Sequence, residues 1–409
     1  MKLPELKINK ERILQGDNVV WMILFALCMI SVVEVYSASS RMTYHSGTHF
    51  WGPVVEHSMY MLLGIFVTWV VHRMPCAIFK VLCAGGMLLS LILLVVVLFK
   101  GRVNDAARWL SIFGFTIQPS EFAKISLVGT AAMLLATLRD KETGGASLLA
   151  LKWVGGLTFV CCVLIVSENF STAGIIFMVM LMMAWYAQAP KKWIWIIVLL
   201  VVVGGGSGFL TLKFVPDETA AYISKETPLH RFATWSNRIK SGSSLPENPM
   251  DYNIRDQVQV THARIAVATC NVVGKGPGQS VQREFLPHAY SDFIYAIIIE
   301  EAGIEGGVLV MFLYLLLLYR AMRIAERCRN RFPAYLVMGL ALMIAVQAML
   351  NMAVSVGAFP VTGQPLPLVS KGGTSTFITC AYIGMILSVS HTAKKIEESE
   401  QTTVQTTQI

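Results

Sequence analysis

Ionisable side chains interrupt several of the long apolar stretches of this sequence. Glu121 and Lys124 lie three residues apart at the start of one such stretch, and Asp292 opens another, with Glu300 eight residues further on. Charged groups in or near hydrocarbon are costly, so they are functional hypotheses by default. A positioned carboxylate can act as a general base, and a neighbouring ammonium group can pair with it. The pattern therefore predicts a reactive or binding site at the ends of apolar helices.

Two segments rich in glycine and proline accompany these residues. Gly274–Gly278 contains three glycines in five residues and resembles a phosphate-cradling loop, which alone is weak evidence. The segment 360–373 predicts a rigid re-entrant turn that could touch a ligand. His and Cys residues nowhere show metal-ligand spacing, so no structural metal is implied.

Each charged residue also has a purely structural interpretation. Asp292 could be only a helix N-cap, since Asp is a favoured capping residue. Glu121 and Lys124 share a helix face and could form a structural ion pair between bundle helices. Glu300 could bond a neighbouring helix, and Glu34 is interpreted as a buried, hydrogen-bonded group.

The composition excludes most classes of protein. The chain has 409 residues, of which 55% are hydrophobic and 14% charged, whereas a soluble domain carries about a quarter charged residues. This excludes a soluble globular enzyme, a disordered protein and a nucleic-acid binder. The net charge of +8 is interpreted as the basic content of cytoplasmic loops, because Lys and Arg recur in short clusters between apolar runs. The eight cysteines lie mostly in apolar runs and predict no disulfide framework.

The predicted fold is an all-α polytopic membrane protein with ten transmembrane helices. A helix needs about 20 mostly apolar residues to span a bilayer. The ten candidate segments are 19–39, 57–72, 76–99, 117–137, 150–167, 169–188, 193–215, 292–319, 333–356 and 372–390.

Charge distribution then predicts the orientation of the chain. Lys and Arg concentrate at both ends and in alternate connections, which puts both termini in the cytoplasm, with no cleavable signal peptide. We expect a cytoplasmic segment 1–18, a membrane domain 19–390 and a cytoplasmic polar tail 391–409, disordered after Glu397. The large extracytoplasmic loop 216–291 contains an amphipathic run, from Gln257 to Val273, that favours order against the membrane surface. All the polar clusters then lie on the outer face, which predicts a polar cavity opening outward.

Three motifs in order resemble the SEDS family, the FtsW and RodA proteins of bacterial cell division and elongation. They occupy most of the chain. The motifs are 104–110 with 118–124, 274–280 with 284–303, and 360–370 with 372–375.

The resemblance implies a peptidoglycan glycosyltransferase that polymerises lipid II, the undecaprenyl-pyrophosphate-linked disaccharide pentapeptide. It makes Asp292 the catalytic candidate and places Glu121 and Lys124 in the same cavity. It also implies a class B penicillin-binding protein as transpeptidase partner, other division-complex membrane proteins, and a location in the bacterial cytoplasmic membrane at the septum. A divalent cation, Mg²⁺ or Mn²⁺, is expected to support the activity, and neither an organic cofactor nor a nucleic-acid partner is expected.

The sequence departs from the family pattern at several positions. Only Arg108 remains of an arginine pair in the first motif, and Glu168 stands beside Asn169 where the family commonly has Pro-Asp. Lys371 stands where Tyr is common. The segment 231–236 resembles the division-type branch, which favours FtsW over RodA.

The chemistry of the implied reaction assigns roles to these residues. The donor sugar is α-linked to pyrophosphate and the polymer is β-1,4-linked, so the displacement inverts the anomeric carbon and needs one base and charge stabilisation. Asp292 is predicted to deprotonate the acceptor 4-hydroxyl. Lys124 is predicted to hold Asp292 ionised or to help neutralise the pyrophosphate, with Arg108 and Lys275 as further phosphate candidates. The remaining predicted substrate-binding residues are Gln118, Ser120, Glu300, Ser370 and Thr374.

Two alternatives from other classes remain open. A lipid II flippase would also use an outward cavity with charged walls, although here the charges cluster at one rim and no internal repeat is visible. A non-catalytic scaffold would recruit the transpeptidase through its spans, and the polar outer rim would then have no use.

Overall fold

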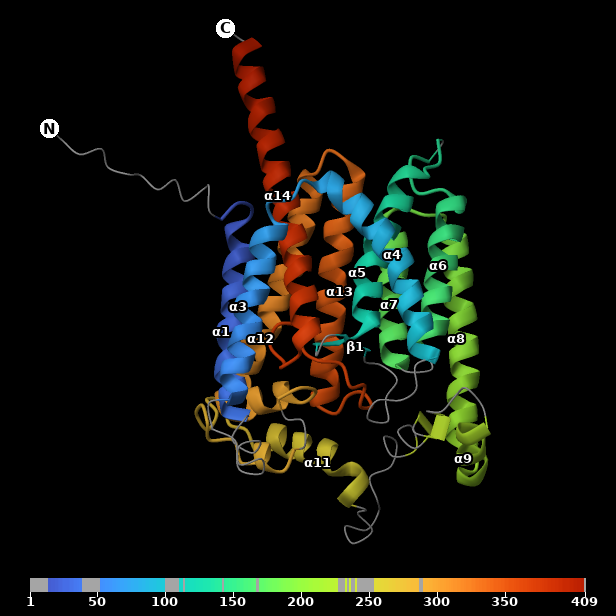
Figure 1. The fold of residues 1–409 in the computed structure, drawn as a ribbon, viewed down its shortest axis with the longest axis vertical. Helices are drawn as coiled ribbons and strands as arrows, with labels where there is room; N and C mark the ends of the chain where they lie inside the picture. Colours follow the sequence, from blue (N-terminus) through green and yellow to red (C-terminus); the bar gives the residue numbers. More distant parts are fainter. Residues whose placement is uncertain are drawn as a thin grey trace, which may run out of the picture.

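The chain folds into a bundle of long helices (Figure 1). The computed structural model describes residues 14–38, 52–99, 110–112, 115–141, 143–166, 169–226, 232–233, 235–236, 240, 254–286 and 290–407. The bundle helices are α1 Asn18–Ala38, α3 Gly52–Val71, α4 Cys76–Phe99, α5 Pro119–Thr137, α6 Leu148–Val166, α7 Phe170–Tyr186, α8 Lys191–Phe214, α12 Ile294–Arg327, α13 Arg331–Ser355 and α14 Gly373–Thr407.

Each of the ten predicted apolar segments coincides with one of these helices. Within the described residues, eight of them are long and apolar enough to cross a membrane. The other two are α7, which has 17 residues, and α5, which carries Glu121 and Lys124 in its first turns. The polytopic membrane architecture is thus confirmed, whereas the count of ten spans stays a prediction.

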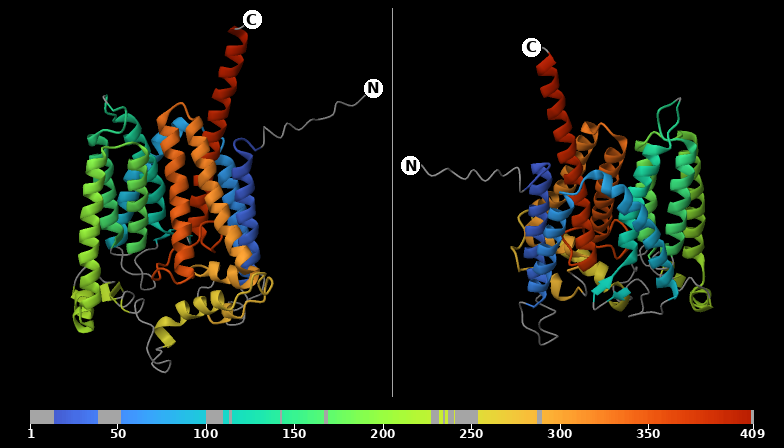
Figure 2. Two further views of the ribbon diagram at one scale, coloured as in Figure 1. Left: turned by 180° about the vertical axis from the view of Figure 1, so that it is seen from behind. Right: turned by 45° about the horizontal axis from the view of Figure 1, so that its top comes forward.

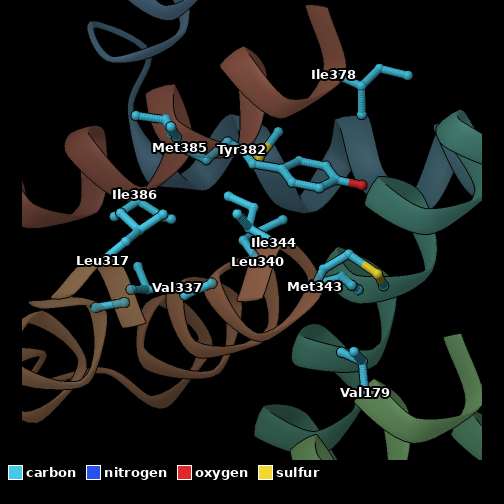
Figure 3. Packing of buried hydrophobic residues seen from close by; sticks show 14 of the residues in the cluster. Val179, Leu317, Val337, Leu340, Met343, Ile344, Ile378, Tyr382, Met385 and Ile386 are labelled. Carbon is cyan, nitrogen blue, oxygen red and sulfur yellow. The ribbon is translucent and has the colours of Figure 1, made fainter. Parts of the chain in front are cut away.

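Helix α13 forms the centre of the bundle and α8 stands at its edge (Figures 1 and 2). Leu340, Met343 and Ile344 of α13 pack with Tyr382 of α14 and Val179 of α7 in one buried apolar cluster (Figure 3). Small residues at helix crossings allow backbones to approach closely in membranes. Helix α13 is therefore fixed by its contacts with α14 and α7, and the polar side chains that it carries are held in place with it.

Gly339 shows how close these crossings are. A Cβ added there would lie 2.6 Å from Met183 Sδ of α7 and 2.7 Å from a methyl carbon of Val128 in α5. A larger residue at this position would push α13 away from both neighbours.

A short antiparallel hairpin precedes α5. It consists of β1 Leu110–Ile112 and β2 Phe115–Ile117, with Ser111 opposite Thr116. The all-α prediction holds for the bundle but misses this hairpin, because three-residue strands are too short to show an alternating pattern. The fourth predicted segment therefore begins as helix at Pro119 and not at residue 117.

The large loop and the tail both differ in part from expectation. The predicted amphipathic run 257–273 is helical only in part, within helix α11 Ile254–Ala268, which lies across the end of the bundle opposite to the end where α14 leaves it (Figure 1). The loop also contains α9 Asp217–Glu226 and the short helix η3 Gln282–Glu284. The tail predicted to be disordered after Glu397 is helical to Thr407, since its Glu and Gln residues are good helix formers and no Gly or Pro interrupts them.

Helix α12 is broken near its start. Gly303 has φ 74° and ψ −175°, a conformation in which glycine is the default residue. A Cβ at Gly303 would lie 2.1 Å from Val272 O and 2.6 Å from Gly274 N, so the loop before α12 touches the break directly. The break separates a short first segment, 294–302, from the long remainder of α12.

Helix α11 supports this short segment. A second, smaller apolar cluster joins α11, the start of α12 and the end of α13. It contains Ala263, Ala266, Leu286, Phe293, Ala296, Ile297 and Val354. Phe293 is fully buried in this cluster. Its packing therefore fixes the position of the neighbouring residue, Asp292.

Candidate functional site

Asp292 stands immediately before Phe293, the N-cap residue of α12. The helix has no side-chain capping bond, so the interpretation of Asp292 as an N-cap does not match the geometry. The half-buried Asp292 accepts a hydrogen bond at Oδ1 from Ser291 Oγ, at 3.0 Å. Its other oxygen, Oδ2, faces Gly363, where an added Cβ would lie 3.6 Å away. Among the described residues no cation pairs with this carboxylate.

Asn351 of α13 holds the backbone of this residue. Its Nδ2 donates to Asp292 O at 2.9 Å and to Gln364 O at 2.7 Å. Asn351 is buried. One side chain from the centre of the bundle thus fixes Asp292 and the loop that faces it.

Ser370 and Lys371 bind the backbone of the segment just before Asp292, residues 290–291. Ser370 Oγ donates to Ser291 O at 2.5 Å and accepts from Leu366 N at 2.8 Å. The backbone N of Lys371 donates to Tyr290 O at 2.9 Å. Burial and the charge of the neighbouring carboxylate raise the pKa of the Tyr290 hydroxyl. The predicted substrate-binding residue Ser370 is therefore placed at the site, with its hydroxyl used to join two segments.

Lys124 is buried and pairs with Glu121, whose Oε1 lies 2.7 Å from the ammonium nitrogen. The same nitrogen donates to Gln347 Oε1 of α13 at 2.8 Å, and Gln347 Nε2 donates to Pro365 O at 3.0 Å. Within the described residues Lys124 makes no ion pair with Asp292. Lys124 instead reaches the loop beside Asp292 through Gln347, and its predicted roles toward Asp292 and the pyrophosphate stay predictions.

The predicted phosphate loop binds a carboxylate of the protein itself. Glu300 is fully buried, and Lys275 Nζ lies 2.6 Å from its Oε1. Ser280 Oγ donates to Glu300 Oε2 at 2.5 Å, and the backbone N–H groups of Val281 and Gln282 donate at 3.2 and 3.3 Å. Lys275 and Glu300, both predicted to bind substrate, are thus bound to each other.

The neighbouring carboxylate, Glu301, also binds the glycine-rich loop. We call these contacts of Glu300 and Glu301 with residues 275–282 the latch. Glu301 accepts from Gly278 N at 2.9 Å, from Ser280 N at 3.2 Å and from Ser37 Oγ of α1. Arg283 Nη1 lies 3.9 Å from Glu301 Oε1. The carboxylates of the α12 segment therefore order the glycine-rich loop and join it to α1.

The other predicted site residues lie at helix starts. Gln118 is the half-buried N-cap of α5, and Ser120 is buried in its first turn. Thr374 is half-buried in the first turn of α14. Arg108 and Glu168 lie outside the described residues.

Several polar residues of the site were missed by the sequence analysis. Gln347 and Asn351 lie one turn apart in an apolar helix, which is the same signal that identified Glu121. Gln364 Nε2 donates to Thr172 Oγ1 of α7 at 2.9 Å. These residues join α5, α13, α7 and the 360–371 loop into one network around Asp292.

Polar atoms without partners gather in the same region. Within the described chain, five buried atoms here have no hydrogen-bond partner. They are Asn169 Nδ2, Asn351 Oδ1, Ser355 Oγ, Thr362 Oγ1 and Gln364 Oε1. Buried polar groups in proteins are nearly always paired, so each unpaired group calls for an explanation. Donors and acceptors that converge near one carboxylate can bind a ligand rich in hydroxyl groups.

The donor set does not form a resident metal cage. Among the described residues no three His, Cys, Asp or Glu side chains lie together as metal ligands. Asp292 is a single carboxylate, and Glu121 and Glu300 are paired with lysines. Magnesium is often bound by one or two carboxylates plus substrate phosphates, so the expected divalent cation stays a prediction.

The fold and the site define a polytopic membrane protein with a polar site at one end of its helix bundle. Residues 17–395 match the model of the FtsW/RodA/SpoVE family, described as cell cycle protein. The chain belongs to this family, which confirms the resemblance to SEDS proteins.

Relatives and solved structures cover nearly the whole chain. It is 30% identical over 389 residues to a probable peptidoglycan glycosyltransferase FtsW from Trichlorobacter lovleyi, covering 93% of this chain and 94% of the relative. It is 33% identical over 395 residues to the FtsW of the same description from Halomonas elongata, covering 93% and 92%. These relatives are of the FtsW type.

Two solved structures share the fold. One is Thermus thermophilus rod shape determining protein RodA, with a TM-score of 0.63 and 20% identity over 92% of this chain and 96% of that one. The other comes from work on the structural coordination of polymerization and crosslinking by a peptidoglycan synthase complex, with a TM-score of 0.68 and 21% identity over 92% and 98%.

Proposed function

We propose that this protein is a peptidoglycan glycosyltransferase that polymerises lipid II at the outer face of the bacterial cytoplasmic membrane during septal wall synthesis. The names of its FtsW relatives support the reaction class. The observation that carries the proposal is the half-buried Asp292 carboxylate, which is fixed through its backbone and has no cation paired with it in the described chain.

The topology that we propose has ten spans, with α5 and α7 among them, and both termini in the cytoplasm. The start of α1 and the end of α14 lie at the same end of the bundle, which supports an even number of crossings (Figure 1). α11 and the Asp292 site then lie at the outer face, where the undecaprenyl chains of donor and acceptor can stay in the bilayer. The membrane itself aligns the two substrates and lowers the entropic cost of their meeting.

In the proposed mechanism Asp292 takes the proton of the acceptor 4-hydroxyl while that oxygen attacks the anomeric carbon of the donor. The attack inverts this carbon and expels the lipid-linked diphosphate. A one-step inversion needs one base and no nucleophilic carboxylate. The unpaired polar atoms around Asp292, among them Gln364 Oε1 and Asn351 Oδ1, are suited to bind sugar hydroxyls.

Glu121 and Lys124 act as positioning residues in this mechanism. Their ion pair is sealed from solvent, and it reaches the loop that faces Asp292 through Gln347. We propose that the pair keeps Gln347, and through it the Pro365 carbonyl, in place.

The partner that we propose is a class B penicillin-binding protein, together with other division-complex membrane proteins. The related chain from the peptidoglycan synthase complex, whose description couples polymerization with crosslinking, supports a transpeptidase partner. A role in division is favoured over elongation by the FtsW relatives.

The test is lipid II polymerisation by the purified full chain, with and without its cognate transpeptidase, in liposomes. Glycan ladders that require this protein support the proposal. The same liposomes measure transbilayer movement of fluorescent lipid II. Movement of lipid II without glycan ladders would show a flippase in place of a polymerase. Absence of both activities would favour a non-catalytic scaffold.

A further inference from the structure

Lys371 lies next to the segment that carries Asp292, and none of the roles above uses its ammonium group. Its backbone N is bonded to Tyr290 O, and the residue before it, Ser370, is bonded to Ser291 O. The ammonium nitrogen pairs with Glu56 Oε2 of α3 at 2.8 Å. A cation is therefore anchored through its backbone beside the reactive segment, while its charged end points to a neighbouring helix.

The three lysines of this region differ in how firmly their partners hold them. Lys124 and Lys275 pair with carboxylates whose side chains are 5% and 0% exposed. Glu56 is 53% exposed and Lys371 is 15% exposed. An ion pair with an exposed partner contributes little to stability, so it exchanges readily for a better anion. A sealed pair cannot exchange in this way without leaving a buried charge unpaired.

We propose that Lys371 leaves Glu56 and binds the diphosphate of a lipid-linked substrate. The inference rests on the proposed function, in which the C1–oxygen bond to the diphosphate breaks as the acceptor oxygen bonds to C1 and its proton passes to Asp292. The diphosphate leaves with the bonding electron pair and one more negative charge. Lys371 offsets this charge, a role for which the sequence had suggested Lys124, Arg108 and Lys275.

The two residues after Lys371 are glycines, so they carry no side chain that could block its ammonium group. An added Cβ at Gly372 meets nothing nearer than 3.6 Å, and one at Gly373 nothing nearer than 3.9 Å. The first turn of α14 contains no acidic residue that would repel an anion. Neither a bulky side chain in the next two positions nor a carboxylate in the first turn of α14 therefore opposes an anion beside Lys371.

The test measures binding of undecaprenyl diphosphate to the full chain in phosphatidylcholine nanodiscs by native mass spectrometry. Lys371→Met is expected to weaken binding about tenfold, the loss of one charge-assisted contact, and Lys371→Arg to keep it within about threefold. Glu56→Gln removes the competitor and is expected to tighten binding about twofold to fivefold. The matched control is Lys192→Met, an exposed lysine in the first turn of α8 at the opposite end of the bundle, which should bind as wild type.

A purely structural role gives the opposite pattern. If the Lys371–Glu56 pair only holds the start of α14 against α3, Lys371→Met and Glu56→Gln weaken diphosphate binding equally. The double variant then binds the diphosphate as strongly as either single variant. That result overturns the inference. Inorganic pyrophosphate serves as a probe without lipid. It should displace the lipid from wild type and not from Lys371→Met at equal occupancy, and displacement unaffected by the substitution also overturns it.

The binding test is independent of turnover, because no acceptor is present. If wild type makes no glycan but Lys371→Met loses diphosphate binding, the polymerase proposal fails and the lysine assignment stands. If glycan forms and Lys371→Met binds as wild type does, the assignment fails and the polymerase proposal stands.

Discussion

At the scale of single residues, the site holds the backbone of Asp292 in place and leaves its carboxylate available. Asn351 and Ser370 hold the backbone of the 291–292 segment by hydrogen bonds from two different elements. The carboxylate itself accepts a bond only from Ser291 within the described chain. A base that is held firmly while its oxygens stay available can meet a substrate hydroxyl without first reorganising.

Asn351→Ala tests this positioning role. The substitution removes the donor to Asp292 O and to Gln364 O, and an unpaired buried carbonyl costs about 1 to 3 kcal/mol. We expect the polymerisation kcat to fall about 10-fold to 100-fold while KM for lipid II changes little. The control is Thr392→Ala, whose hydroxyl donates within its own helix to Ser388 O. An equal loss through KM alone would argue for a direct substrate contact by Asn351.

At the scale of elements, the break in α12 and the glycine-rich loop form one structure. Gly303 and Gly274 both have positive φ and meet at their backbones. Glu300 and Glu301 lie just before the break and accept the N–H groups of the loop. The loop therefore sets the direction of segment 294–302, which begins beside Asp292.

Gly303→Ala tests the requirement for glycine at the break. The left-handed backbone conformation alone costs a residue with a Cβ about 1 to 3 kcal/mol, and the clash with Val272 O adds to this. We expect a lower Tm in detergent. The matched control is Gly155→Ala in α6, where an added Cβ meets nothing within 4 Å and should raise stability slightly. Equal Tm values for the two variants would show that the break is not strained.

Glu300→Gln tests the latch between the loop and α12. The amide keeps the size of the side chain but loses the charge that Lys275 neutralises, and breaking a buried pair is strongly destabilising. We expect hydrogen exchange at the amides of Val281 and Gln282 to accelerate at least about tenfold, since local opening becomes easier. Lys275→Arg keeps the pair and should exchange as wild type does. Unchanged exchange in Glu300→Gln would assign the order of the loop to its glycines alone.

At the scale of the whole molecule, the helices were predictable and many of their contacts were not. Long apolar runs become helices because a bilayer leaves backbone groups no other partners, so all ten segments were found. The partner of Lys124 outside its own helix is Gln347, 223 positions away, and no local pattern indicates that contact.

The candidate site was predictable in its centre and less so in its surroundings. Asp292, Ser370 and the loop 360–373 stand out in the sequence because each interrupts an apolar pattern, and in the fold hydrogen bonds join their segments. The glycine-rich loop resembles a phosphate-cradling loop in sequence, and in the fold N–H groups of the loop and of the residues after it face Glu300 and Glu301. Sequence shows which groups are able to bind an anion, whereas only the fold shows that the protein supplies the anion itself.

The proposed orientation is tested by labelling single cysteines in a background without the native ones. Val273, 75% exposed in the large loop, is replaced by Cys, and Lys394 of α14 is replaced by Cys in a second variant. An impermeant maleimide applied to intact spheroplasts should label the first and not the second. Permeabilisation should then expose the second, and labelling of both before permeabilisation would contradict the topology.

The central claim is that Asp292 is the base of a glycan polymerase, and the measurement that tests it is single-turnover polymerisation of lipid II by Asp292→Asn. The partner transpeptidase is present, and Glu305→Gln, an exposed carboxylate beyond the break in α12, is the control. We predict that Asp292→Asn forms glycan at least about 100-fold more slowly, while it binds lipid II and its partner as wild type does. Glycan formation at the wild-type rate by this variant would contradict the account.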